Sequence, residues 1–431
     1  MAKNFLRGPT LSFSSKPADE NSPGIDYFED GVLIIQDGII ENVLDAQAFE
    51  REGGDLQSCE HLTDSLILPG LIDTHIHYPQ MDMIASYGSQ LLEWLEKYAF
   101  PAEVAFASAE HAQLKSEAFL DRLAANGTTS ALVYTTVHAV STEALFAAAD
   151  ARNIRLITGK VMMDRNAPDN LRDHDDGIAD SIELIERWHG QGRLSYAVTP
   201  RFAVTCSHQQ MTRSGELLER YPGIYLHTHM SEHPDEISAT LELFPDAPHY
   251  VDVYDRYGMI NERSVFAHGI HLSDEELTRL SEAGACIAFC PSSNMFLGSG
   301  LLDLARLEEF GVTMSVATDV GAGTSFSMLA TLGDGYKVAQ LRGQSWHPMK
   351  AFHAATLGNA EALGLGDKIG RLAAGYEADI TVLQPTPGSV LADRLTNTKT
   401  LTEQLFAYMT LGAEDAVARC YIDGKLAYKA E

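Results

Sequence analysis

Basic residues are scarce in this chain, and long apolar runs are missing. Its 431 residues include 31 lysines and arginines against 60 aspartates and glutamates, which gives a net charge of −29. Because such a charge repels polyphosphates and anionic lipid surfaces, we expect neither nucleic acid nor a membrane as a partner. The amino-terminal residues hold no apolar stretch typical of a signal peptide, and no later run approaches membrane-spanning length. We therefore expect a cytoplasmic protein.

Cysteine is also scarce, with five residues scattered along the chain. An odd number at irregular spacing in a chain of this length argues against a disulfide framework. Cys286 and Cys290 share one face of a strand-like run, but they lack the further ligands of a zinc ribbon. We therefore expect the cysteines to be small buried apolar side chains.

Short apolar or β-branched runs alternate with amphipathic stretches through the middle of the chain. An apolar content of 45% supports a large core, and strands that alternate with helices are typical of a parallel β/α architecture. The sequence therefore predicts an α/β fold with a (β/α)8 barrel of the TIM type. The eight predicted strands begin near Ile67, Thr128, Arg155, Ser195, Gly223, Ser264, Ala285 and Thr313.

The two ends of the chain have the pattern of a separate β-domain. Residues 31–40 and 418–426 each read as two strands joined by an Asp-Gly turn. We predict that both termini combine into one small β-sandwich domain beside the barrel. The predicted boundaries are 1–66 for its N-terminal part, 67–370 for the barrel and 371–431 for its C-terminal part.

The segment 78–107 departs from the alternation of strands and helices. It holds no clear barrel strand but is rich in aromatic side chains, among them Trp94, Tyr98 and Phe100. Because it follows the first predicted strand, we expect this insertion to lie over the mouth of the barrel. We expect its aromatic side chains to pack in its own core, and the alternative is that they close the pocket.

The ends of the predicted strands carry residues that bind metals or move protons. The C-terminal ends of barrel strands are where such enzymes place their chemistry. The first predicted strand ends in His75-Ile76-His77, and its two imidazoles share a face because strand side chains at i and i+2 point the same way. The later candidates are Arg201 and Phe202 after the fourth run, His227, His229 and Glu232 after the fifth, His268 after the sixth and Asp319 after the eighth.

Imidazoles and a carboxylate at neighbouring strand ends indicate a metal site. An aspartate at the end of an apolar strand, such as Asp319, is costly to bury without a cation. Neutral imidazole suits both zinc and iron, so this donor set admits either metal. A cation of this kind lowers the pKa of a bound water to about 7, which allows hydrolysis at neutral pH.

Six motifs together resemble the amidohydrolase superfamily and, within it, the guanine deaminase family of ATZ/TRZ-like metal-dependent hydrolases. They are PGLIDTHIHYPQ (69–80), LEWL (92–95), TPRF (199–202), HMSE (229–232), AHG (267–269) and TDV (318–320). The resemblance spans most of residues 66–330, and it implies a barrel with one zinc per chain in a homodimer. The metal ligands that it implies are His75, His77, His229 and Asp319.

The residue at the end of the fourth predicted strand, Arg201, indicates one metal ion rather than two. Binuclear members of the superfamily use a modified lysine at the end of the fourth strand, where this chain has Arg201. The His-x-Glu and Pro-Cys-x-x-Cys signature of deaminases that act on flipped bases is also missing from the sequence. Any deamination would therefore use the chemistry of the barrel.

The resemblance implies a reaction in purine catabolism, the hydrolytic deamination of guanine to xanthine and ammonia. Glu232 would shuttle the proton of the attacking water, His268 would hold or polarise that water, and Asp319 would bind metal and accept the proton. His227 would hydrogen-bond behind the ligands. The substrate site that the resemblance implies is lined by Gln80, Arg201, Phe202, His229, Glu232, His268 and Asp319.

The choice of base depends on three of these side chains. Arg201 only donates hydrogen bonds, so it can pair with O6 of guanine but not with the amino group of adenine. Gln80 has both a donor and an acceptor to read the ring edge, and Phe202 would either stack on the purine face or pack in the core. The alternatives are an aminohydrolase for a pterin, a triazine or cytosine, and a non-catalytic metal-binding relative. The presence of Glu232 and His268 argues against the last.

Overall fold

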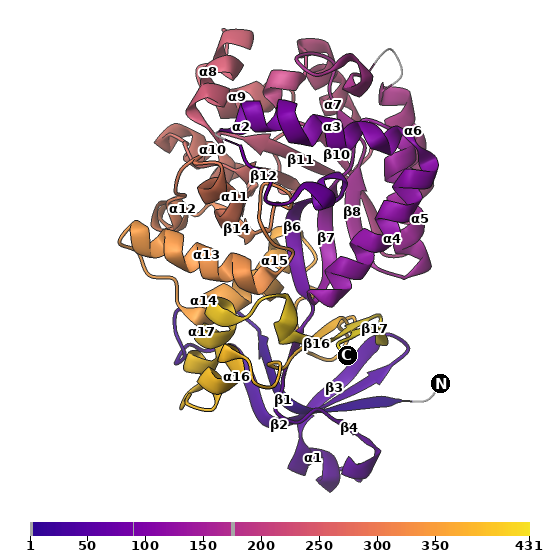
Figure 1. Cartoon of the computed structure of the whole chain (residues 1–431), viewed down its shortest axis with the longest axis vertical. Helices are drawn as coiled ribbons and strands as arrows, with labels where there is room; N and C mark the ends of the chain where they lie inside the picture. Colours follow the sequence, from indigo (N-terminus) through magenta and orange to yellow (C-terminus); the bar gives the residue numbers. More distant parts are fainter. Residues whose placement is uncertain (1–2, 89, 174–176) are drawn as a thin grey trace.

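The computed structural model describes residues 3–88, 90–173 and 177–431 as two sheets with helices packed around them. One sheet curves into a parallel barrel, and the other is built from both ends of the chain and lies at the opposite end from helices α2 (Leu91–Trp94) and α3 (Phe100–Val104) (Figure 1). None of the described helices combines the length and the apolar character needed to cross a membrane.

The predicted barrel is confirmed, with eight parallel strands in sequence order. A short extra strand, β9 (Val161–Met162), pairs with the end of the fourth barrel strand. The barrel strands are β6 (Leu71–His77), β7 (Thr128–Tyr134), β8 (Arg155–Gly159), β10 (Leu194–Pro200), β11 (Tyr225–Met230), β12 (Ser264–His268), β13 (Cys286–Phe289) and β14 (Thr313–Val316).

The first predicted strand is in fact two strands that belong to different sheets. β5 (Leu66–Pro69) pairs with β15 (Ile380–Leu383) of the terminal sheet, and the barrel strand β6 begins only after Gly70. A side chain at Gly70 would meet the Thr129 hydroxyl at 2.0 Å, so the crossover requires glycine. The continuous apolar pattern hid this break because both halves are fully buried.

The barrel closes between its first and last strands by a few specific contacts. The backbone N–H of Asp319 donates to the carbonyl of His75 (2.9 Å), and the N–H of His77 donates to the carbonyl of Val320 (2.8 Å). The Asn359 side-chain amide also bridges the two strands. Its nitrogen donates to the carbonyls of Ile72 on β6 (2.7 Å) and Val316 on β14 (2.8 Å), and its oxygen accepts from the backbone N–H of Val316 (2.8 Å). The ends of β6 and β14 are therefore held side by side, which brings Asp319 next to the two histidines.

Helices follow the barrel strands and cover their outer face (Figure 1). One start that the sequence marks is α10, where Ser273 and Glu276 form the reciprocal hydrogen bonds of a capping box. The helices around the barrel are α4 (Ala109–Ala125), α5 (Ala139–Ala151), α6 (Gly177–Trp188), α7 (His208–Arg220), α8 (Pro234–Leu243), α9 (Tyr250–Asp255), α10 (Asp274–Ala283), α11 (Pro291–Phe296), α12 (Leu304–Phe310), α13 (Met328–Leu341), α14 (Pro348–His353) and α15 (Asn359–Ala362).

The predicted β-domain from both termini is confirmed as one sheet of eight strands. Both predicted Asp-Gly turns form, and both residues of each have positive φ, as in a two-residue hairpin turn. The division of the chain into domains at residues 66 and 370 stays a prediction. The terminal sheet itself extends through β5 to residue 69. The remaining strands are β1 (Asn4–Phe13), β2 (Ile25–Gln36), β3 (Ile39–Asp45), β4 (Glu60–His61), β16 (Val417–Ile422) and β17 (Lys425–Lys429), with helices α1 (Ala46–Arg51), α16 (Val390–Leu395) and α17 (Leu401–Leu411).

The insertion after β6 forms a chain of short helices at the C-terminal end of the barrel (Figure 1). Between α2 and α3 lies a π-helical turn, Leu95–Ala99. Trp94 and Phe100 are buried, whereas Tyr98 is only partly buried. Of the cysteines, Cys59 is partly exposed, so the prediction that all are buried is wrong for that residue, which lies on the terminal domain.

Candidate active site

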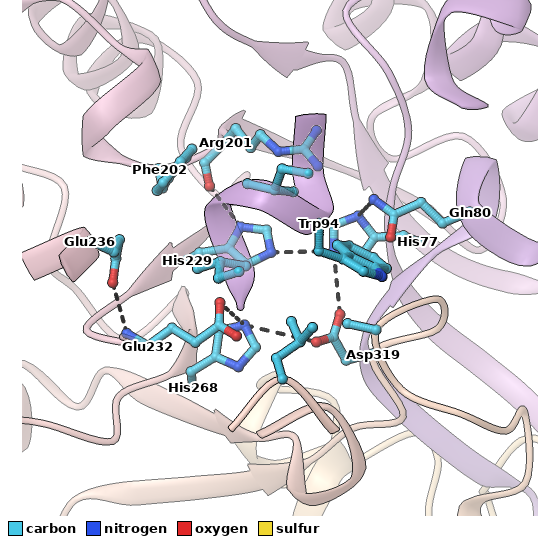
Figure 2. A pocket seen from close by; sticks show the side chains of 14 residues that line it. His77, Gln80, Trp94, Arg201, Phe202, His229, Glu232, Glu236, His268 and Asp319 are labelled. Carbon is cyan, nitrogen blue, oxygen red and sulfur yellow. Dashed lines mark hydrogen bonds and ion pairs between the residues drawn. The ribbon is translucent and has the colours of Figure 1, made fainter. Parts of the chain in front are cut away.

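Four side chains at three strand ends bring their ligand atoms together. Nε2 of His77 lies 3.2 Å from Nε2 of both His75 and His229, and 3.5 Å from Oδ1 of Asp319. Nε2 of His75 lies 3.3 Å from the same carboxylate oxygen. A proton on one imidazole could satisfy only one of these contacts, whereas a cation would satisfy all of them. Figure 2 shows His77, His229 and Asp319 turned toward one another.

These distances fit a tetrahedral metal site. Ligand atoms about 2.0 to 2.1 Å from zinc lie about 3.3 Å from one another in tetrahedral geometry. The four distances recorded among these donors, 3.2 to 3.5 Å, agree with that value. His268 also lies near His75 and His229, but its Nε2 is 3.9 Å from the nearest Asp319 oxygen. The set predicted from the sequence is therefore the better fit.

The second ring nitrogens of the histidines are held by neighbours on the barrel wall. Nδ1 of His229 donates to the carbonyl oxygen of Arg201 at 2.7 Å. Nδ1 of His75 lies 2.7 Å from Nε2 of His227, the residue that the sequence analysis places behind the ligands. Because each Nδ1 is used in this way, the Nε2 lone pairs of His75 and His229 face the shared space.

Burial keeps this cluster in the form that binds a cation. Desolvation lowers the pKa of His75, His77 and His229 well below the ordinary histidine value, so these imidazoles are neutral. Burial raises the pKa of the Asp319 carboxyl to about 6, and a cation at this place would favour its charged form. Cys290 lies close to Asp319, but burial raises the pKa of its thiol well above the ordinary value. Without a bound cation this thiol is therefore neutral, and Cys290 forms a second possible donor group with His268 and Asp319.

The backbone is strained where the site residues leave their strands. Ser231, His268 and Asp319 have φ values of 51°, 76° and 51°, a left-handed region that side chains rarely adopt. Each residue in this conformation lowers the stability of the fold by about 1 to 3 kcal/mol, and such strained residues are common at functional sites. Buried Asp73 stabilises the last of these turns, because its carboxylate accepts from the backbone N–H groups of Thr318 (3.1 Å) and His75 (3.2 Å).

Glu232 and His268 form a pair beside the ligand cluster. Oε2 of Glu232 lies 3.4 Å from Nε2 of His268, and Oε1 accepts from the Ser299 hydroxyl at 3.0 Å. Nδ1 of His268 lies 2.9 Å from the amide oxygen of Asn294, which accepts its proton and leaves Nε2 facing Glu232. Burial, helped by the nearby charge of Asp319, raises the pKa of Glu232 to about 8. This carboxyl therefore holds and releases a proton near neutral pH.

One cavity joins these groups to the side chains predicted to bind substrate. The insertion supplies an apolar wall through Leu91, Trp94 and Leu95, so Trp94 both packs in a buried apolar cluster and lines the cavity. The predicted substrate-site residues all line this cavity: Gln80, Arg201, Phe202, His229, Glu232, His268 and Asp319 (Figure 2).

Sequence reasoning missed several residues that contact the predicted ones. Asn294 and Ser299 carry no motif of their own; Asn294 lies on α11, the helix after β13, and Ser299 lies just beyond that helix. Glu236 lines the cavity and accepts hydrogen bonds from the backbone N–H groups of Glu232 and His233. Glu103, on the insertion, is fully buried against Arg201 and Gln80. The only signal for Glu103 in the sequence was an acidic residue within a segment rich in aromatic side chains.

A family model described as the amidohydrolase family matches residues 66–427. The chain belongs to the amidohydrolase family. Members of this family are metal-dependent hydrolases, and the histidine and aspartate cluster is a possible metal-binding group of that kind. The chain is also 46% identical to the guanine deaminase of Escherichia coli (strain K12) over 412 residues, which are 95% of this chain and 94% of that protein.

Solved structures of other amidohydrolases have the same fold. The crystal structure of guanine deaminase from Bradyrhizobium japonicum superposes with a TM-score of 0.94 at 34% identity, covering 100% of both chains. That of guanine deaminase from C. acetobutylicum with guanine bound in the active site gives a TM-score of 0.90 at 25% identity, covering 99% of this chain and 100% of that one. The resemblance that the six motifs predicted is therefore confirmed.

Proposed function

We propose that this amidohydrolase is a guanine deaminase, which hydrolyses guanine at C2 to xanthine and ammonia. The observation that carries the proposal is the single cavity in which Arg201 and Gln80 face the histidine and aspartate cluster and the Glu232–His268 pair. The likeness to relatives named guanine deaminase, which extends over almost the whole chain, supports the same reaction.

We propose His75, His77, His229 and Asp319 as the ligands of one zinc ion. The recorded distances and the neutral state of the imidazoles support this set, and nitrogen and oxygen donors in tetrahedral arrangement favour zinc over harder ions such as magnesium. Iron accepts the same donors and is distinguished from zinc by elemental analysis. The ion, when bound, supplies the Lewis acid that makes water acidic enough to attack at neutral pH.

Glu232 moves the protons in this proposal. The water that attacks C2 gives a proton to the Glu232 carboxylate, which passes it to a ring nitrogen of guanine. The second proton of the water then goes to the exocyclic amine, the C2–N bond breaks, and ammonia leaves as the C2 carbonyl of xanthine forms. His268 orients the water from the side of Asp319, because Asn294 holds its ring in place. The raised pKa of Glu232 suits a group that both accepts and donates a proton.

The other end of the cavity reads the base. Arg201 donates to O6 of guanine, Gln80 pairs with the ring edge, and Phe202 lies against the purine face. All three side chains are almost fully buried, with 2%, 2% and 5% exposure. A buried donor that loses its partner is costly, so a site of this kind rejects bases that lack the matching acceptor.

Ammonia release from a panel of bases tests the substrate. We expect kcat/KM for guanine to exceed that for a pterin, a triazine, cytosine and adenine by at least about 100-fold. Adenine is the sharpest control, since it has the size of guanine but presents an amino group where Arg201 needs an acceptor. A higher kcat/KM for any other base would overturn the choice of guanine, and no ammonia from any base would favour a non-catalytic relative.

The homodimer, the cytoplasmic location and the place in purine catabolism that the resemblance implies stay predictions. Sedimentation velocity of the purified protein checks the first of them. We expect a species of twice the chain mass of 47.1 kDa, and a single species at the chain mass would contradict the dimer.

A further inference from the structure

Glu103 is a buried carboxylate that no step of the proposed reaction uses. It lies on α3 of the insertion, outside the barrel, and it is fully buried. A charge that deep in the protein is costly unless it is paired and hydrogen-bonded. Its partners are the two side chains proposed to read the base, although they lie 98 and 23 residues away in the sequence.

Both oxygens of Glu103 are committed to these partners. They accept from the same Arg201 nitrogen, Nη1, at 2.9 and 2.7 Å, and Oε1 also accepts from Nε2 of Gln80 at 3.0 Å. One carboxylate thus holds both base-reading side chains at once. The pair with Arg201 is shielded from solvent at both ends, with exposures of 0% and 2%, so water does not compete with it.

We propose that Glu103 is a positioning residue that aligns Arg201 and Gln80 to read a base with a carbonyl at C6. This inference rests on the proposed function, since guanine supplies that carbonyl. Glu103 itself does not contact the base. It acts through the two side chains and so sets the selectivity of the site.

The arrangement of Arg201 leaves the right donors free. Glu103 uses only Nη1, and no hydrogen bond from Nε or Nη2 to a described residue is recorded, so these N–H groups remain for a ligand. The ring of Phe100, also on α3, lies 5.2 Å from the guanidinium carbon. The same short helix therefore fixes the guanidinium through charge and through an aromatic face, and Arg201 lines the cavity.

The same carboxylate decides which way the Gln80 amide points. A side-chain amide can present either its donor or its acceptor to a ligand, and its neighbours select between the two. Glu103 can only accept, and its contact at 3.0 Å is the shorter of the two recorded side-chain contacts of Nε2, the other being Nδ1 of His77 at 3.4 Å, while Oε1 lies 3.4 Å from the backbone N of Gly321. A neutral residue at position 103 would lose the charge-assisted bond and allow the amide to turn.

A pair of ligands separates positioning from a merely structural role. Hypoxanthine has the C6 carbonyl and purine lacks it, and neither carries the C2 amine that is hydrolysed. Calorimetric titration therefore measures binding without turnover. We expect Glu103→Gln to raise the Kd of hypoxanthine by about 10- to 100-fold, the loss expected when hydrogen bonds to a charged group are misaligned. The Kd of purine should change by less than about 3-fold, because purine does not use the Arg201 donors.

Two further variants complete the test. Glu96→Gln removes an exposed acid from the same insertion and should change neither Kd. Glu103→Asp keeps the charge that balances Arg201, so it protects the fold, but it is too short to hold both partners and should also weaken hypoxanthine selectively. Metal content should match the wild type in both, and thermal melting should match it in Glu96→Gln.

The inference is overturned if Glu103→Gln and Glu103→Asp weaken both ligands equally, or if the ratio of the two Kd values stays at the wild-type value. If the wild-type protein deaminates guanine while that ratio does not change, the proposed function stands and only the role of Glu103 falls. If the wild type binds purine as tightly as hypoxanthine, the reading of the C6 carbonyl by Arg201 is wrong, and the role of Glu103 falls with it.

Discussion

Replacing Glu232 with glutamine is expected to lower kcat for guanine by about 10²- to 10⁴-fold, the usual contribution of a general acid and base. Glutamine keeps the size of the side chain and an oxygen that can accept from Ser299 (3.0 Å in the native site), but it cannot carry a proton. Metal content should stay at the wild-type value, since Glu232 is not among the proposed ligands. Steady-state kinetics together with elemental analysis measures both quantities.

The neighbouring residue Asp235 provides the control for this substitution. Asp235 is exposed at the start of α8, so Asp235→Asn removes a negative charge from the same turn without reaching the cavity. Its kcat should equal that of the wild type. Full activity of Glu232→Gln would show that another group moves the proton, and the assignment of the shuttle would be wrong.

Replacing His77 with alanine is expected to remove the metal and, with it, all measurable deamination. Nε2 of His77 lies within 3.5 Å of a ligand atom of each of the other three proposed ligands, so its loss opens the centre of the cluster. The three remaining donors, two imidazoles and a buried carboxylate, would no longer form a tetrahedral set around the ion. Elemental analysis after dialysis should find less than about a tenth of the wild-type metal, because the loss of the central ligand removes one of the bonds that hold the ion.

His61 serves as the matched control, because it is an exposed histidine on β4 of the terminal sheet. His61→Ala should retain both metal and activity. Circular dichroism should show the same secondary structure in both variants, since His77 packs at a strand end and not in the middle of the apolar core. A His77→Ala protein with a full complement of metal would contradict the ligand set.

The barrel and the histidine pair at the end of its first strand could be predicted because their signal is local. A β-strand alternates its side chains, so a histidine pair at the end of an apolar run must point to one face, and parallel strands bring their C-terminal ends together. Strand alternation brings His75 and His77 to one face, whereas the choice of His229 over His227 and the inclusion of Asp319 came from the resemblance to the amidohydrolases. The Asp-Gly hairpins of the terminal sheet were predictable for the same reason, since the turn residues are adjacent in sequence.

Long-range partners left no such signal. Glu103 pairs with Arg201 across 98 residues, and Ser299 reaches Glu232 across 67, so neither contact follows from spacing along one element. The change of sheet at Gly70 was hidden because the residues that flank it, Leu66–Pro69 and 71–72, are all apolar. Trp94 belongs to a segment without strand periodicity, where an aromatic side chain can equally fill a core or line a cavity, and only the three-dimensional packing distinguishes the two.

Metal titration of the stripped protein measures the central proposal most directly. The protein is freed of metal with a chelator, zinc is added in steps, and xanthine and ammonia are measured from guanine at each step. We expect both products to appear in equal amounts and their rate to rise in proportion to zinc until one ion is bound per chain. Saturation at two ions per chain, or no xanthine at full occupancy, would contradict a guanine deaminase that works with a single metal ion.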